Sequence, residues 1–121
     1  MKEYFFDTYA VIELLRESHS YAPYLNEQIR ITLLNLIEIS YITLLEQGEE
    51  AAKRVLGWCK EFVVDVPDVV IMAAVTFRAQ NKKKSLSYAD CLGYAFARQH
   101  DLIFLTGDDA FNRMPGVEFV K

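Results

Sequence analysis

The sequence lacks the features that mark secreted, zinc-binding and membrane-spanning proteins. It has only two cysteines, Cys59 and Cys91, which form no C-x-x-C pair and have no histidine near them, so neither a disulfide framework nor a zinc site is predicted. No stretch approaches the roughly 18 uncharged apolar residues that a transmembrane helix needs. The N-terminus reaches Asp7 before any apolar run attains signal-peptide length. We therefore expect a cytoplasmic protein, without a membrane role, whose cysteines are reduced and buried.

Basic residues are fewer than acidic residues, and the formal net charge is -4. This argues against a protein that holds nucleic acid through a broad basic surface, because such binding depends on displacing counterions from phosphates. The objection weakens if several carboxylates surround one or two divalent cations, because the ions then cancel most of that charge. The net charge alone does not exclude a nucleic-acid substrate.

What the chain does contain is the composition of a soluble globular protein. Hydrophobic residues make up 52% of its 121 residues and charged residues 25%. A chain of this length buries one sizeable core and leaves little room for a second. We expect a single domain over residues 1–121.

Short apolar segments alternate with helical patterns along the whole chain. The predicted strands are residues 4–6, 29–32, 62–66, 102–105 and 117–120. The predicted helices are residues 10–15, 33–47, 49–60, 67–80 and 88–100, with a lysine-rich loop at 81–86. This alternation predicts a three-layer α/β/α sandwich around a central, mostly parallel sheet of four or five strands.

Three aspartates occupy positions at which a ligand site and a purely structural role are both expected. Asp7 directly follows the first predicted strand, and Asp108 lies three residues after the strand that ends at Leu105, so both fall where α/β folds bind ligands. Taken singly, however, Asp7 is also a normal helix N-cap, and Asp108 is a normal turn residue. Asp90 stands three residues after Ser87, which resembles a capping box.

Glu38 is harder to explain as a structural residue. Helical spacing places Leu34, Tyr41 and Leu45 around it, so its carboxylate is predicted to lie in the middle of an apolar face. An unpaired ionised carboxylate there is costly, so an arginine, a lysine or a metal ion is needed as its partner. Because Asp7, Asp90 and Asp108 can converge on the same end of the sheet, a metal ion is the sharper hypothesis. Oxygen ligands alone favour Mg²⁺ or Mn²⁺ over zinc.

At this point the sequence resembles the PIN-domain nucleases, and especially the toxin ribonucleases of the VapC type. The resemblance covers nearly the whole chain and rests on four segments in the expected order and spacing. They are Phe6-Asp7-Thr8, Leu36-Ile37-Glu38, residues 86–95 with the motif Ser87-x-x-Asp90, and residues 105–111 with the motif Thr106-x-Asp108-x-x-Phe111.

The resemblance implies a metal-dependent endoribonuclease with a PIN-like fold. It implies that Asp7, Glu38, Asp90 and Asp108 hold Mg²⁺ or Mn²⁺ and position a water molecule that hydrolyses RNA without a histidine base. Asp109 is an alternative outer ligand, although the spacing to Phe111 favours Asp108 as the inner one. Thr8, Thr106 and Ser87 are expected to orient the carboxylates through hydrogen bonds.

One residue departs from the family pattern, and several others allow two interpretations. Tyr9 stands where the family often has a small hydroxyl residue, so it either packs beneath the site or narrows it. The basic residues near the acids are either RNA contacts or solvated surface residues; they are Lys82, Lys83, Lys84 and Arg113, with Arg98 a weaker candidate. The aromatic residues Tyr21, Tyr24, Trp58 and Phe62 are either core residues or an exposed patch.

The resemblance favours the toxin of a toxin–antitoxin pair, with an antitoxin protein and a second copy of the chain as partners. One alternative is an RNA-processing nuclease of the same fold that has no antitoxin. Another is a binding module in which the acids survive only as helix caps. A phosphatase-like domain is disfavoured, because no nucleophilic aspartate with a lysine partner stands near a strand end.

Overall fold

A computed structural model describes all residues of the chain, 1–121, and contains a parallel sheet with helices on both faces. The three strands are β1 (Tyr4–Phe6), β2 (Ile103–Thr106) and β3 (Val117–Phe119). They lie in the order β1-β2-β3, and both neighbouring pairs are parallel. The predicted three-layer α/β/α fold is confirmed.

The sequence predicted two further strands, at residues 29–32 and 62–66, and here the prediction was too generous. These segments form only a single parallel bridge between Ile31 and Val63. The backbone N–H of Phe6 donates to the carbonyl of Arg30 at 2.9 Å, so the two segments continue the sheet beyond β1. They stay short because Thr32 already caps the next helix and a 3₁₀ turn occupies Lys60–Phe62.

The five predicted helices are present with nearly the predicted ends. They are α1 (Thr8–Leu15), α2 (Leu33–Gln47), α3 (Glu49–Cys59), α4 (Asp68–Gln80) and α5 (Tyr88–Gln99). Gly48 ends α2 with φ +93°, a conformation that glycine adopts without strain. Short 3₁₀ turns cover His19–Tyr24, Lys60–Phe62, Lys82–Lys84 and Asp109–Phe111. None of the helices has the length and hydropathy to cross a membrane.

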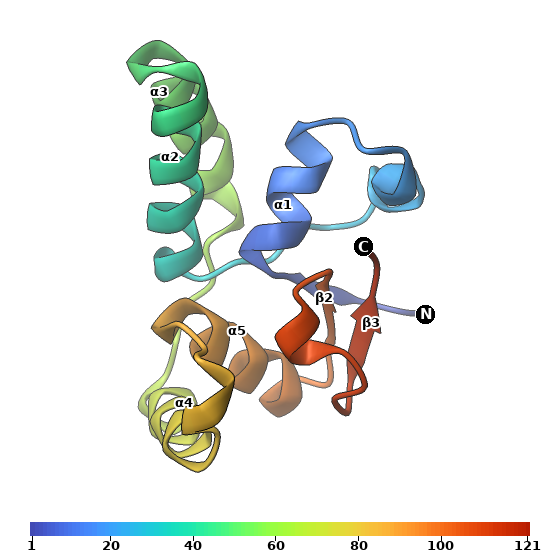
Figure 1. Cartoon of the computed structure of the whole chain (residues 1–121), viewed down its shortest axis with the longest axis vertical. Helices are drawn as coiled ribbons and strands as arrows, with labels where there is room; N and C mark the ends of the chain where they lie inside the picture. Colours follow the sequence, from blue (N-terminus) through green and yellow to red (C-terminus); the bar gives the residue numbers. More distant parts are fainter.

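Side chains that alternate along the strands fill a separate core on each face of the sheet. Phe5 and Phe104 pack with α4 and α5 on one face, whereas Phe6 and Leu105 pack with α1 and α2 on the other. In Figure 1, α4 and α5 lie to the lower left of the strands, and the α2–α3 pair extends upward, away from the sheet. Cys59 and Cys91 are both buried and free, as expected.

The sequence allowed two placements for Tyr21, Tyr24, Trp58 and Phe62, and the structure places some of them in the core and some at the surface. Tyr21 is fully buried and Tyr24 is half-buried, and both belong to the core that contains α1. Trp58 is 41% exposed and meets Phe62 edge to face, with ring centroids 4.9 Å apart. The first pair is therefore core, and Trp58 lies at the surface.

Candidate metal centre and its surroundings

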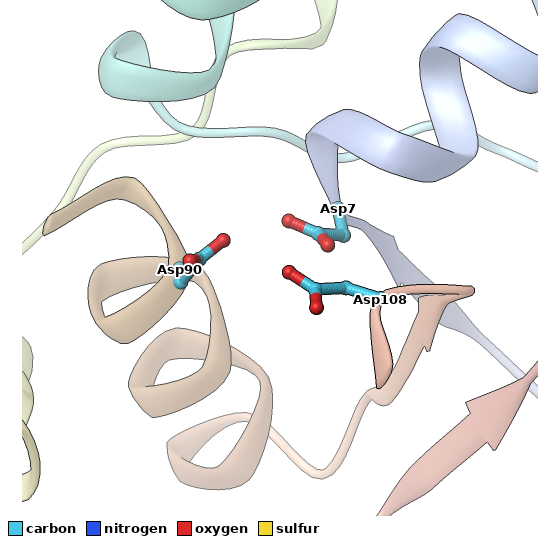
Figure 2. A group of neighbouring side chains, drawn as sticks. All are labelled: Asp7, Asp90 and Asp108. Atoms are coloured by element: carbon cyan, nitrogen blue, oxygen red, sulfur yellow. The ribbon is translucent and has the colours of Figure 1, made fainter. Parts of the chain in front are cut away.

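The structure brings Asp7, Asp90 and Asp108 together from three distant parts of the sequence. One carboxylate oxygen from each lies within 4.8 Å of the other two. Figure 2 shows the three side chains pointing toward a common centre, Asp7 from the start of α1, Asp90 from the first turn of α5 and Asp108 from the loop after β2. These acids therefore form a cluster at the carboxyl end of the sheet, where the sequence predicted a site.

Each of the three aspartates also accepts a hydrogen bond from the backbone at the start of a helix, so the structural role that the sequence allowed is present. Asp7 Oδ1 accepts from the N–H of Thr8 at 2.9 Å, and Asp108 Oδ1 accepts from the N–H of Ala110 at 3.0 Å. Asp90 Oδ2 accepts from the N–H of Ser87 at 2.8 Å, while Ser87 Oγ accepts from the N–H of Asp90 at 3.0 Å. The caps fix each carboxylate and leave Asp90 Oδ1 and Asp108 Oδ2 available for an ion.

Asp7 is the most buried member of the cluster, with 2% of its surface exposed. Burial, together with the nearby charge of Asp90, raises the pKa of Asp7 to about 8, although hydrogen bonds from Thr106 and Thr8 oppose the shift. Burial also raises the pKa of Asp90, and hydrogen bonds from Ser87 oppose that shift. A nearby cation would favour the charged forms of both carboxylates.

Glu38 lies in the same cavity but outside this cluster of three. Thr8 Oγ1 donates to Glu38 Oε1 at 2.6 Å, so a hydroxyl is the partner of this carboxylate in the protein. The prediction that it lies in a buried apolar face was wrong, because Tyr41 and Leu45 are 60% and 66% exposed. Apolar residues occur all around α2, so their spacing could not identify the buried face.

Asn35 is a site residue that is not among those predicted from the sequence. It is fully buried, and its Nδ2 donates to Thr8 Oγ1 at 3.0 Å. Its Oδ1 accepts from the N–H of Thr32 at 2.9 Å and completes a capping box at the start of α2. Asn35 therefore holds the Thr8 hydroxyl in the orientation that donates to Glu38. The spacing Thr32-x-x-Asn35 was the available signal.

Thr8, Thr106 and Ser87 each donate a hydrogen bond to one of the four predicted carboxylates, Ser87 through its backbone N–H. Thr106 Oγ1 donates to Asp7 Oδ2 at 2.7 Å and accepts from the N–H of Asp108 at 3.0 Å, so a single hydroxyl links two of the acids.

Asp109 is not brought to the cluster. Its side chain is 78% exposed, and its Oδ1 accepts from Lys121 Nζ at 2.7 Å. Among the basic candidates, Lys84 Nζ lies 3.4 Å from the carbonyl of Ala110, two residues beyond Asp108. Lys82, Lys83 and Arg113 are exposed and make no side-chain contact with the acids. Lys84 therefore makes a side-chain hydrogen bond to the turn that follows Asp108.

Tyr9 packs beneath the loop of Asp108 and also lines the cavity. A Cβ at Gly107 would lie 2.3 Å from Tyr9 Cε1 and 2.3 Å from the carbonyl oxygen of Val120. The tyrosine therefore occupies the space that a side chain at Gly107 would need. This position agrees with packing against the site, while a narrowing of the site by Tyr9 stays a prediction.

The acids open into a cavity of 480 Å³ between α1, α2 and the start of α5. The charged residues that line it are Asp7, Glu13, Arg16, Glu38, Glu46, Asp90 and Asp108. This is a solvent-accessible site with a strong excess of negative charge.

The donor set fits a hard divalent cation. Three carboxylates that converge within 4.8 Å, one of them buried, repel one another unless a cation or protons neutralise them. All of these donors are oxygens, and no histidine or cysteine lines the cavity, which suits Mg²⁺ or Mn²⁺ rather than zinc.

Three solved structures with this fold are bacterial toxins or toxin–antitoxin complexes. A toxin–antitoxin complex from Klebsiella pneumoniae aligns at 22% identity and a TM-score of 0.73, covering 96% of both chains. VapBC2 from Rickettsia felis, bound to a DNA fragment from its promoter, aligns at 19% identity with a TM-score of 0.73, covering 96% of this chain and 97% of the other. The sarcin-ricin-loop-cleaving toxin VapC20 from Mycobacterium tuberculosis aligns at 15% identity with a TM-score of 0.70, covering 89% of this chain and 92% of its own.

The amino-acid sequence identifies the family to which the chain belongs. The PIN domain family matches residues 4–117, which is nearly the whole chain. No curated protein matches the sequence. The chain therefore belongs to the PIN-domain family, as its motifs predicted.

Proposed function

We propose that this protein is a Mg²⁺- or Mn²⁺-dependent endoribonuclease. The observation that supports this most directly is the convergence of Asp7, Asp90 and Asp108 at the mouth of an open cavity in a PIN domain. The three aspartates would hold the ion, and Glu38 would act from the side of α2, where Thr8 fixes its carboxylate. When bound, the ion would lower the pKa of a water molecule and polarise the phosphodiester.

The remaining site residues position these carboxylates. Thr106 holds Asp7 and the backbone of Asp108 in one arrangement, and the capping box of Ser87 does the same for Asp90. Lys84 lies beside the Asp108 loop, where its ammonium group would attract an RNA phosphate. The hydroxyls of Thr8 and Ser87 in the cavity are engaged with Glu38 and with the backbone of Asp90, and no histidine lines the cavity to activate them as nucleophiles, so hydrolysis by water fits the available groups.

The biological role we propose is that of a toxin whose partner is an antitoxin protein. The similar complexes from Klebsiella pneumoniae and Rickettsia felis support this role, because they align over 96% of this chain. A second feature that supports a protein partner is an apolar cleft of 660 Å³ between α2, α4 and α5. Next to it, Val69 and Met72 on α4 are 60% and 62% exposed, and exposed apolar surface of this kind marks interaction sites. A homodimer remains a prediction.

RNA cleavage by matched variants tests the proposed activity. Asp90→Asn and Asp108→Asn should each reduce Mn²⁺-dependent cleavage of single-stranded RNA by at least a hundredfold, because each removes a charged ligand from the centre. Asp109→Asn is the matched control, since it removes the same charge from the neighbouring exposed residue and should leave cleavage within about twofold. Undiminished cleavage in both site variants would refute the assignment.

A second experiment tests the alternative that the protein is a binding module without catalytic activity. A metal centre gains stability when it binds its ion, so Mn²⁺ should raise the melting temperature of the wild type and not that of Asp108→Asn. If Mn²⁺ stabilises neither protein, the acids are helix caps only. Coexpression with the product of an adjacent small gene, scored by relief of growth arrest, separates a toxin from an RNA-processing nuclease.

A further inference from the structure

The acidic cavity is a groove between one face of α1 and one face of α2. One wall contains Thr8, Ile12 and Arg16, the C-cap residue of α1, with Tyr9 and Glu13 beside them, and the other wall contains Glu38, Ile42 and Glu46 of α2. The two sets of three, Thr8 to Arg16 and Glu38 to Glu46, are each spaced at i, i+4 and i+8, which places each set on a single face. Thr8 meets Glu38 at the end near the aspartates, and Arg16 meets Glu46 at the far end. Eight residues correspond to about 12 Å along a helix, so the groove continues well beyond the metal centre.

Arg16 is the only basic residue among those that line this groove. The other charged side chains there are six carboxylates. An extended RNA strand that placed one phosphate at the aspartates would carry further phosphates along the groove, where Glu13 and Glu46 would repel them. A cation at the far end is what such a strand needs, and Arg16 supplies it.

The guanidinium of Arg16 is held by carboxylates in the free protein. Its Nη2 donates to Glu46 Oε2 at 2.6 Å, and its Nη1 lies 3.9 Å from Glu13 Oε1. The Arg16 and Glu46 side chains are 49% and 45% exposed, and ion pairs that are exposed to this extent are weak. A phosphate can replace Glu46 here, because the planar guanidinium forms two parallel hydrogen bonds to phosphate oxygens.

We propose that Arg16 binds a backbone phosphate of the RNA substrate, separate from the phosphodiester at the three aspartates, and that Glu46 competes with this phosphate for the guanidinium. This inference rests on the proposed ribonuclease function and adds a second anchoring point for its substrate. Arg16 is a substrate-binding residue in this account, and it takes no part in the chemical step.

Two substitutions with opposite expected effects test the proposal. Arg16→Gln should raise the KM for single-stranded RNA about tenfold and leave kcat within about twofold, because a charge-assisted contact is lost away from the reacting bond. Glu46→Gln should lower the KM about threefold, because the competitor is removed. Glu49→Gln is the matched control, since it removes the same charge from the exposed pair that Glu49 forms with Lys53 outside the groove.

The double variant separates this mechanism from a general effect of charge. If Glu46 acts by holding Arg16, Glu46→Gln no longer lowers the KM when Arg16→Gln is also present. If Glu46→Gln still lowers the KM in the double variant, Glu46 acts only through its negative charge, and the proposal is overturned. A KM raised equally by both single substitutions, with both melting temperatures lowered, identifies the pair as a structural tie and also overturns it.

Binding measurements keep this test independent of cleavage. In an Asp90→Asn background, fluorescence anisotropy with a labelled single-stranded RNA of mixed sequence gives the Kd in the presence of Mn²⁺. Arg16→Gln should weaken binding about tenfold and reduce the slope of log Kd against log salt by about 0.7. An unchanged Kd and slope would refute the role of Arg16, whereas absence of cleavage in the wild type would refute the ribonuclease function alone.

Discussion

The hydroxyl of Thr106 donates to Asp7 Oδ2 at 2.7 Å, although 99 positions separate the two residues in the sequence. The same oxygen accepts from the backbone N–H of Asp108 at 3.0 Å. Because β1 and β2 are neighbouring parallel strands, Asp7 and Thr106 reach the same edge of the sheet together. This one side chain sets the spacing between two of the three carboxylates.

Replacing Thr106 by valine removes that link at nearly constant volume. We expect Thr106→Val to weaken Mn²⁺ binding by about tenfold to a hundredfold, since groups that orient metal ligands have effects of this size. Calorimetric titration with Mn²⁺ measures the change. Thr43→Val is a suitable control, because Thr43 is also buried and donates only to the carbonyl of Ile39. Equal Mn²⁺ affinity in the two variants would contradict the positioning role.

The pKa of Asp7 predicts how the metal-free protein responds to pH. Its pKa rises from 3.8 to about 8 on folding, so between these values the folded state binds a proton that the unfolded state has released. The contribution of Asp7 to the free energy of unfolding is therefore fully present below about pH 4 and is lost as the pH rises through 8. In EDTA, the melting temperature of the wild type should fall across this range, and that of Asp7→Asn should fall less. If the melting temperatures of the two proteins change in parallel with pH, Asp7 is ionised over the whole of this pH range.

Asn35 connects the cap of α2 to the hydroxyl that holds Glu38. Asn35→Leu should reduce the free energy of unfolding by about 2 kcal/mol, because a buried capping residue and two of its partners lose hydrogen bonds. It should also lower kcat, because Thr8 then lacks the donor that fixes its orientation. Urea unfolding and RNA cleavage measure the two effects. Asn81→Leu breaks the hydrogen bond from Asn81 Nδ2 to the carbonyl of Phe77 outside the cavity, so it should lower stability without lowering kcat.

The contact between Tyr9 and Gly107 predicts a glycine that tolerates no side chain. Gly107→Ala should lower both stability and Mn²⁺ affinity, because its Cβ would clash with Tyr9 and with the Val120 carbonyl next to Asp108. Adding Tyr9→Ser should restore only part of the loss, because the clash with the Val120 carbonyl remains. Gly57→Ala, on α3 with no atom within 4 Å of the new Cβ, should be neutral or slightly stabilising. If Gly107→Ala binds Mn²⁺ as tightly as Gly57→Ala, the packing argument is wrong.

The sequence predicted the order of elements well, because each helix carries its own start or stop signal. Thr32 and Ser87 cap their helices, and Gly48 ends α2. The predicted strands at residues 29–32 and 62–66 were mostly extended loop, because β-branched residues favour extended backbone whether or not it pairs. Local propensity does not report how long two segments stay side by side.

The site was predicted in part, and for unequal reasons. Asp7 and Asp108 follow strands, and parallel strands end at one edge, so their convergence could be anticipated. The argument from Glu38 used helical spacing, which fails on a helix that is apolar all around, and the structure gives Glu38 a hydroxyl partner instead. The capping-box spacing could have identified Asn35 only as a cap, and nothing in the sequence identified Arg16, because the roles of both residues at the site depend on which faces of α1 and α2 meet.

Calorimetric Mn²⁺ titration of the wild type, Asp108→Asn and Asp109→Asn tests the central claim most directly. If Asp7, Asp90 and Asp108 form the metal centre, Asp108→Asn should bind Mn²⁺ at least about tenfold more weakly than the wild type, and Asp109→Asn should bind it equally well. Binding that is lost in Asp109→Asn and kept in Asp108→Asn, or a wild type that binds no Mn²⁺, would contradict the account.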